Sequence, residues 1–184
     1  MRKLYYLLNE EFYRLLKPLS VLCLFNTIGQ LLLVKIKAGD YEALTNRFEY
    51  FYSTSGCMIL FTLCLLAVIG LFIINFYSHY WGSKSIYTLL TLPISRNKIY
   101  LIMITSYYFG LLLFYLLNIV TVFLGYSLYV ASLKNMYWVS KYVMNNGLFL
   151  ALVRSDILKI IFPLTLNGLI FSTALFLLIP AAVL

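Results

Sequence analysis

Charged side chains are scarce in this sequence of 184 residues, since Asp, Glu, Lys and Arg together make up 11% of it. A soluble domain averages about 25% charged residues. Hydrophobic residues reach 63%, and the mean hydropathy is +0.92. A chain of this length cannot hide so much apolar surface in one soluble core. The composition therefore predicts a protein of the lipid bilayer.

Acidic residues are absent from the apolar runs that we predict to cross the membrane. Carriers driven by proton or sodium gradients usually need an intramembrane acid, so we expect the energy for any transport to come from another chain. The net charge is +8, and the basic residues lie mostly between the apolar runs. There they set topology or meet anionic lipid headgroups, and we predict no nucleic-acid partner.

Cysteine and histidine are also rare. The three cysteines are an odd number, which excludes a complete disulfide framework. Cys57 and Cys64 lie roughly 10 Å apart along one predicted helix, too far to form a bridge. We expect both, and Cys23, to be small buried hydrophobes. His79 is the only histidine and has no partner at metal-ligand spacing, so we predict no metal site and interpret it as an interfacial or partner-contact residue.

Two enzyme signatures are missing. The phosphate-binding pattern G-x-x-x-x-G-K-[ST] does not occur, and GSKS at Gly82 lacks both the leading glycine and a preceding strand. Ser78 precedes His79, but no G-x-S-x-G elbow exists. We therefore predict that the chain is not an enzyme, with no catalytic residue and no bound cofactor. An intramembrane enzyme is kept as an alternative, which loss of activity in His79→Ala would support.

The first 17 residues have helical spacing. Leu4, Leu8, Phe12 and Leu15 fall on one face, and most of the charged residues fall on another. Such an amphipathic helix just before a membrane span favours an interfacial position over residues 1–17. The alternative is an ordinary helix packed on the protein. The charges also interrupt the apolar stretch that a cleaved signal peptide needs.

Four apolar runs are predicted to cross the membrane, over residues 18–36, 56–78, 97–131 and 160–184. The third is about 50 Å long as a helix, which exceeds one crossing but is too short for two. We expect a single long helix that projects from the membrane. The predicted fold is all-α, a polytopic membrane helix bundle in one domain, residues 1–184. Because the chain ends in apolar sequence, one expectation is a truncated C-terminus.

The positive-inside rule does not decide the orientation, because seven basic residues lie on each predicted side. Two details favour a cytoplasmic N-terminus. Four basic residues precede the first span and three follow it. The loop between the second and third spans is basic and has no acid, whereas the loop over residues 35–49 is balanced.

That basic loop, GSKSIYTLLTLPISRNKIY, covers residues 82–100. Ser83 is suited to cap a short helix, and Pro93 ends it. Ser95 is suited to cap the next helix, the long third span. The pattern predicts a short amphipathic helix over residues 82–93, held between two spans at the membrane surface. This helix either passes a push from a soluble partner into both spans or only anchors them, and the residues alone leave both open.

The letters LLTLPISRNKIYL, from Leu89 to Leu101, resemble the segment after the second span in ABC-2-type transporter permeases. In that family an apolar run ends in LP and is followed by a small or apolar residue, Ser and Arg. The layout of residues 1–133 is also similar. The resemblance implies a permease subunit of an ATP-driven exporter in the cell inner or plasma membrane. The family usually has six spans, whereas this sequence shows four, and residues 134–159 are longer than the expected connection.

The resemblance implies that a separate ATP-binding subunit holds ATP and Mg²⁺ and that a second copy or a sister permease completes the exporter. Carried over to this sequence, the ATPase-coupling contact comprises Trp81, Gly82, Lys84, Ile86, Leu89, Leu90, Pro93, Ser95 and Arg96. The alternative function is a non-transporting immunity or scaffold protein, which would have no ATPase partner.

Polar and aromatic residues inside the predicted spans are candidates for a substrate path: Asn75, Tyr107, Tyr108, Tyr115 and Asn118. Buried amides, which include Asn26 and Gln30, more often join helices than line a path. Many of the seventeen tyrosines lie at predicted span ends and predict an aromatic belt at the membrane surfaces, with Tyr50, Tyr52, Tyr126 and Tyr129 among them.

Overall fold

The computed structural model describes residues 2–39, 47–81 and 95–135, together with the isolated residues 149, 154, 167, 170, 174 and 178. The three described stretches form the helices α1 (Arg2–Lys37), α3 (Phe48–Thr54), α4 (Cys57–Trp81) and α6 (Arg96–Asn135), and they contain no strand. The predicted all-α fold class is confirmed.

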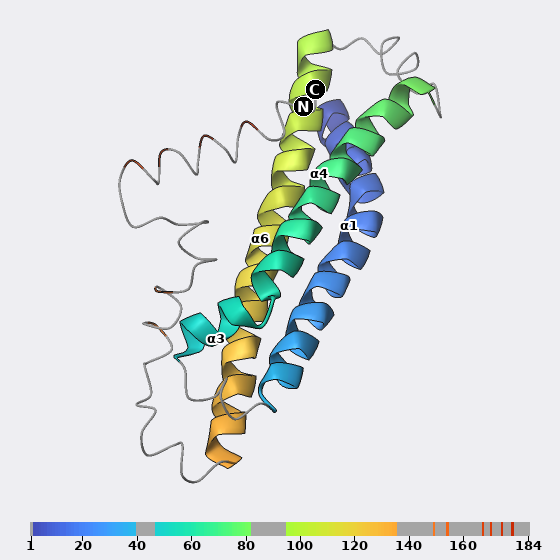
Figure 1. Ribbon diagram of the computed structural model, residues 1–184. Helices are drawn as coiled ribbons and strands as arrows, with labels where there is room; N and C mark the ends of the chain where they lie inside the picture. Colours follow the sequence, from blue (N-terminus) through green and yellow to red (C-terminus); the bar gives the residue numbers. More distant parts are fainter. Residues whose placement is uncertain are drawn as a thin grey trace.

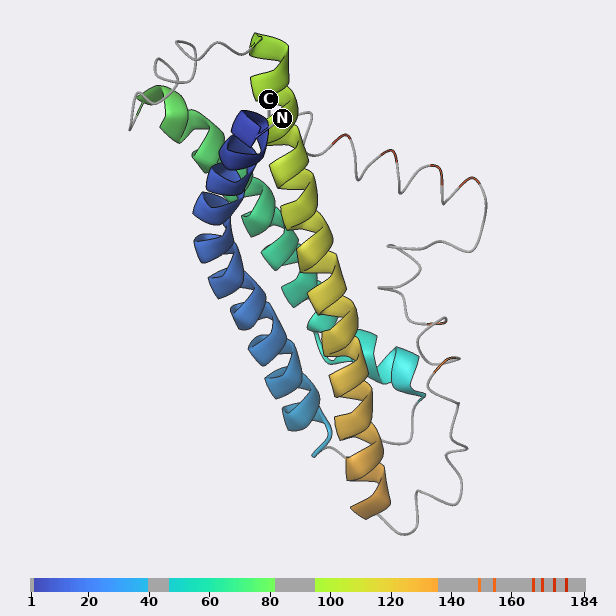
Figure 2. The same cartoon turned by 180° about the vertical axis from the view of Figure 1, so that it is seen from behind.

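The three long helices pack side by side as a bundle (Figures 1 and 2). Helix α4 runs antiparallel to α1 and α6, so the start of α1, the end of α4 and the start of α6 lie together at one end. We call this the head end. Among the residues that the structure describes, three segments are long and apolar enough to cross a membrane: Tyr5–Lys37, Cys57–Ser78 and Asn97–Ser132. The chain is a multi-pass helical membrane protein.

Aromatic rings and small residues fill the middle of the bundle. Phe72 of α4 stacks on Tyr107 of α6 with ring centroids 4.9 Å apart, and both are fully buried. A Cβ at Gly110 would lie 3.5 Å from Leu19 and 3.6 Å from Phe72, so this glycine lets α6 approach both neighbours closely. Large apolar side chains such as Leu66 point outward, toward the hydrocarbon that a spanning helix meets.

Helix α1 is continuous through Pro18, whereas the sequence predicted a boundary there between an interfacial helix and the first span. Proline lacks the N–H that would bond the carbonyl of Arg14, yet helices within membranes tolerate this loss when neighbouring elements hold them. Here Leu15 and Leu19, on either side of Pro18, are both buried in the core shared with α4 and α6. Packing on both sides of the proline therefore keeps one helix.

Helix α3 is an element that the sequence analysis missed. It lies across the half of α6 that is remote from the head end (Figures 1 and 2). Its aromatic residues at i, i+3 and i+4, Phe48, Phe51 and Tyr52, are buried. The rings of Phe48 and Phe51 contact the ring of Tyr129 of α6, with centroids 5.5 Å and 5.1 Å away. Tyr52 and Tyr129 are thus core residues, and the prediction that they belong to an aromatic belt is wrong.

The second and third predicted spans coincide closely with helices. Residues 56–78 correspond to α4, and residues 97–131 lie within the 40 residues of α6. As one helix, α6 is roughly 60 Å long, about twice the hydrocarbon thickness, as expected for a helix that projects from the membrane. The predicted helix over residues 82–93 and the predicted span over residues 160–184 lie outside the continuously described residues.

Candidate functional site

Four polar side chains meet inside the bundle, and we call them the buried amide cluster: Asn26 and Gln30 of α1, Tyr52 of α3 and Asn118 of α6. None of them is more than 2% exposed. Asn26 and Gln30 are four residues apart, so the helix brings them to the same face. The short helix α3 carries Tyr52 in from the side. The cluster therefore ties three separate elements together.

Gln30 is the centre of the hydrogen-bond network. Its Nε2 donates to Oδ1 of Asn26 at 2.9 Å and to Oδ1 of Asn118 at 3.0 Å. Its Oε1 accepts from the Tyr52 hydroxyl at 2.6 Å. Asn26 Nδ2 also donates to Oδ1 of Asn118 at 3.2 Å. The side chain of Gln30 thus makes three hydrogen bonds, to three different residues on three helices.

Asn118 carries one unpaired group. Its Nδ2 is buried and makes no hydrogen bond in the part of the chain that the structure describes. Leaving a buried donor unsatisfied costs about 1–3 kcal/mol. The Oδ1 of the same side chain accepts two hydrogen bonds, which offsets that cost. The cluster therefore holds α1 to α6 while leaving spare donor capacity on α6.

The chemistry of the cluster is neutral. Burial raises the pKa of the Tyr52 phenol, with a smaller contribution from neighbouring Cys57. Cys57 lies at the start of α4, where its Sγ is 3.1 Å from the hydroxyl of Ser55. It is a free buried thiol, like Cys23 and Cys64, as the sequence analysis predicted. A protonated phenol and three amides carry no charge, so the cluster is suited to joining helices and to meeting uncharged hydrogen-bonding groups.

The residues predicted to line a substrate path lie in separate parts of the structure. Asn75 Nδ2 donates to the Tyr107 hydroxyl at 3.4 Å, a long bond between α4 and α6. Asn118 is 11 residues further along α6, roughly 16 Å away, in the amide cluster. Tyr115 packs beside the ring of Phe61, whose centroid is 6.2 Å away.

Tyr108, the remaining candidate, is half-buried on α6, next to Phe109. The structure thus joins Asn75 to Tyr107 and gives Asn118 two new neighbours, Asn26 and Gln30. Asn26 and Gln30 are four residues apart in a charge-free run, and this spacing was the sequence signal that they share one helix face.

The head end forms a second site, where α1 packs against both of its neighbours. The Arg14 guanidinium donates to the Ser78 hydroxyl near the end of α4 at 2.8 Å. Leu7 packs against a small core made by Phe76, Ile99 and Met103. The first turns of α1 therefore contact the last turns of α4 and the first turns of α6. The interfacial position of residues 1–17 stays a prediction, since a helix at the membrane surface can also make these contacts.

The predicted ATPase-coupling contact is connected to this head end. Trp81 is the last residue of α4, and Arg96 is the first residue of α6. Ser95 directly precedes α6, and its carbonyl accepts from the N–H of Lys98 at 2.9 Å. The other predicted contact residues fall in the stretch 82–94, outside the described residues: Gly82, Lys84, Ile86, Leu89, Leu90 and Pro93. Their role stays a prediction.

Comparisons with known proteins found no relative of this chain. The chain matches no protein-family model, no curated protein and no solved structure.

Proposed function

We propose that this chain is a membrane-spanning subunit of an ATP-driven exporter, coupled to a separate ATP-binding subunit through the segment that joins α4 to α6. The observation that carries the proposal is the packing at the head end. There the start of α1, the end of α4 and the start of α6 lie together, so a push on the connecting segment would reach all three long helices.

The contacts at the head end support this transmission. Arg14 and Ser78 link α1 to α4 by a hydrogen bond, and Leu7 packs against the core made by Phe76 of α4 with Ile99 and Met103 of α6. Packed cores do not deform continuously, so a displacement at one end tilts helices as units. Residues 89–101 resemble ABC-2-type permeases, and from this resemblance we infer that the partner is an ATP-binding subunit.

The exporter proposal can be tested by capturing the partner. The full chain, purified with an ATP-binding-cassette subunit encoded beside it, should bind that subunit and stimulate its ATPase. Changing Leu89 and Leu90 to Ala together with Arg96→Glu should lower both by about tenfold or more, because the loss of a single hot-spot residue at the centre of an interface costs about 2 kcal/mol or more.

Arg47→Glu is the matched control, since this exposed residue precedes α3, away from the head end. It should leave binding and ATPase stimulation unchanged. If the changes at residues 89, 90 and 96 also leave them unchanged, the coupling contact is wrong. If the unaltered chain captures no such ATPase, the exporter proposal fails.

One observation favours the second candidate, a non-transporting membrane scaffold or immunity protein. The middle of the bundle is filled by stacked rings, such as Phe72 on Tyr107 and Phe61 on Phe114. A transport path through the middle of the three described long helices would have to displace them. We therefore infer that the exporter has its path outside this described bundle, as at an interface with a second copy or a sister permease. The scaffold needs no path and would bind no ATPase.

A further inference from the structure

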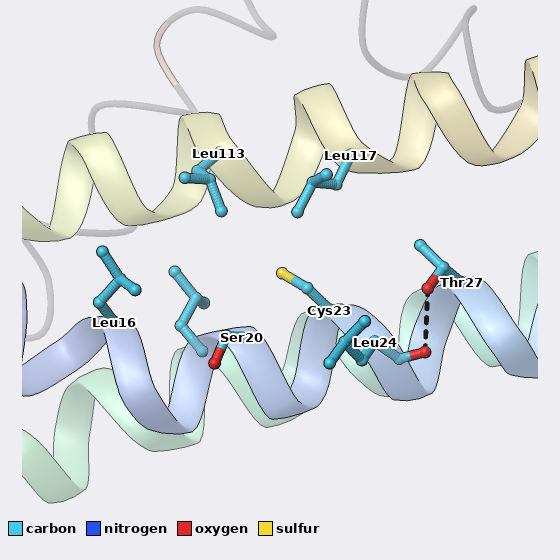
Figure 3. Close-up of a pocket in the computed structure, with 8 residues that line it drawn as sticks. Leu16, Ser20, Cys23, Leu24, Thr27, Leu113 and Leu117 are labelled. Atoms are coloured by element: carbon cyan, nitrogen blue, oxygen red, sulfur yellow. Dashed lines mark hydrogen bonds between the residues drawn. The ribbon is translucent and has the colours of Figure 1, made fainter.

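A groove of about 360 Å³ lies between α1 and α6. Six residues of α1 between Leu16 and Thr27 form one wall, and Leu113 and Leu117 of α6 form the other. Figure 3 shows these side chains reaching into the space from the two helices. The groove is separate from the buried amide cluster, none of whose residues line it.

The polar atoms in the wall are already used within α1. The Ser20 hydroxyl donates to the carbonyl of Lys17 at 2.8 Å, and the Thr27 hydroxyl donates to the carbonyl of Leu24 at 2.9 Å. The other wall residues are leucines and Cys23. Without a free hydroxyl donor, the groove suits an apolar occupant and offers a polar one little.

The groove lies within a segment that is able to span the membrane, Tyr5–Lys37. From Leu16 to Thr27 it follows α1 for roughly 16 Å, the length of a chain segment and not of a compact ligand. Apolar spaces in proteins stay free of ordered water and bind hydrocarbon. Within a bilayer the available hydrocarbon is a lipid acyl chain.

A positive charge stands at the head-end limit of this groove. Lys17 is exposed, and it shares a face of α1 with Ser20 at i+3 and Leu24 at i+7, both of which line the groove. Its long side chain is able to reach the membrane surface while its methylene groups stay near the apolar wall. A lysine near the surface attracts anionic lipid by about 1 kcal/mol.

We propose that the groove between α1 and α6 binds one acyl chain of an anionic phospholipid, whose phosphate pairs with Lys17. The site requires the apolar walls, formed by α1 and α6, together with the basic residue, which belongs to α1. It does not depend on the exporter proposal, because a scaffold protein would hold the same lipid.

The experiment uses the full chain in phosphatidylcholine vesicles that contain a small fraction of phosphatidylglycerol with a diazirine on its acyl chain. After illumination, labelled peptides are identified by mass spectrometry. Labels are expected on the two walls of the groove, about fivefold more than with the same diazirine on phosphatidylcholine. Lys17→Gln should remove this fivefold preference and leave the phosphatidylcholine label unchanged.

Leu117→Trp fills the groove and should lower the wall labels from both lipids by about fivefold or more. Leu66→Trp is the matched control, because Leu66 is an exposed leucine of α4 outside the groove. It should leave the wall labels unchanged. Unaltered labelling in Leu117→Trp would overturn the proposal. Labels confined to the outer face around Leu66 would also overturn it, and they are expected if a second copy or another segment of this chain occupied the groove. Equal labelling of the groove walls by phosphatidylglycerol and phosphatidylcholine would overturn it as well.

Discussion

Gln30 shows how one residue organises the interior. Its amide donates to Asn26 and Asn118 and accepts from Tyr52, so it contacts its own helix, α6 and α3. Hydrogen bonds between helices in membranes average about 0.6 kcal/mol each. Two of the three Gln30 bonds, to Asn118 and Tyr52, join different helices. They stabilise the packing modestly but specify the rotation of α1 about its axis, since a rotated α1 would lose both.

The buried phenol of Tyr52 should make the free energy of unfolding depend on pH in alkaline solution. Burial raises the pKa of its phenol, so above pH 10 the unfolded chain loses this proton while the folded chain keeps it. The free energy of unfolding therefore falls as the pH rises above 10, by about 1.4 kcal/mol per pH unit from this group. Tyr52→Phe should cost about 1 kcal/mol at pH 8 and make the loss above pH 10 shallower. Unfolding in mixed micelles between pH 8 and 11.5 measures both.

The control for that measurement is Tyr50→Phe on the same short helix, where the side chain is 61% exposed. At pH 8 it should change the free energy of unfolding by less than about 0.5 kcal/mol. An alkaline loss that is equally steep with and without the Tyr52 hydroxyl would show that Tyr52 is not buried in the folded chain.

At the scale of elements, glycine sets how closely the helices approach. Gly110 of α6 faces Leu19 and Phe72, and a Cβ there would already be in van der Waals contact with both. Gly70 of α4 has no described neighbour within 4 Å of its Cβ position. Both lie within long helices, so a leucine has the same intrinsic helix preference at either position. The two glycines differ only in what surrounds them.

Gly110→Leu should destabilise the bundle by about 1–3 kcal/mol, because three further carbons would collide with α1 and α4. Gly70→Leu, the matched control, should be neutral or slightly stabilising. The free energy of unfolding of each variant in mixed micelles is the measurement. Equal effects of the two substitutions would contradict the close packing of α6 on α1 and α4.

At the scale of the whole molecule, the antiparallel course of α4 determines which segments share a membrane side. Tyr5 and Ser95 are both exposed at the head end, whereas Arg47 is exposed near α3. The native cysteines Cys23, Cys57 and Cys64 are buried, which gives a low background for thiol labelling.

An impermeant maleimide added to sealed vesicles should therefore label Tyr5→Cys and Ser95→Cys from one side and Arg47→Cys from the other. The reason is that one spanning helix, α1, separates Tyr5 from Arg47, whereas two, α1 and α4, separate Tyr5 from Ser95. Permeabilised vesicles, in which all three variants react, serve as the control. Labelling of Tyr5→Cys and Ser95→Cys from opposite sides would disprove the bundle topology, and labelling of Ser95→Cys from outside a cell would remove the access of an intracellular ATPase.

The amino-acid sequence by itself determined the class of the protein and two of its long helices. Runs without charge over residues 56–78 and 99–131 have to enter hydrocarbon, and there a chain satisfies its backbone groups within one segment only as a helix. Local composition was enough, so α4 and α6 lie where the runs predicted them.

Only the tertiary structure decided which helix continues through a proline, which aromatic side chains are buried and which polar side chains contact one another. Packing carries α1 through Pro18, and the core shared with α6 buries Tyr52, which looked like a surface residue. The buried amide cluster joins Asn26 to Asn118 across 92 residues of sequence. Each helix shows its polar residues but not the rotation or partner that pairs them, because that choice minimises the unpaired donors and acceptors of all the helices at once.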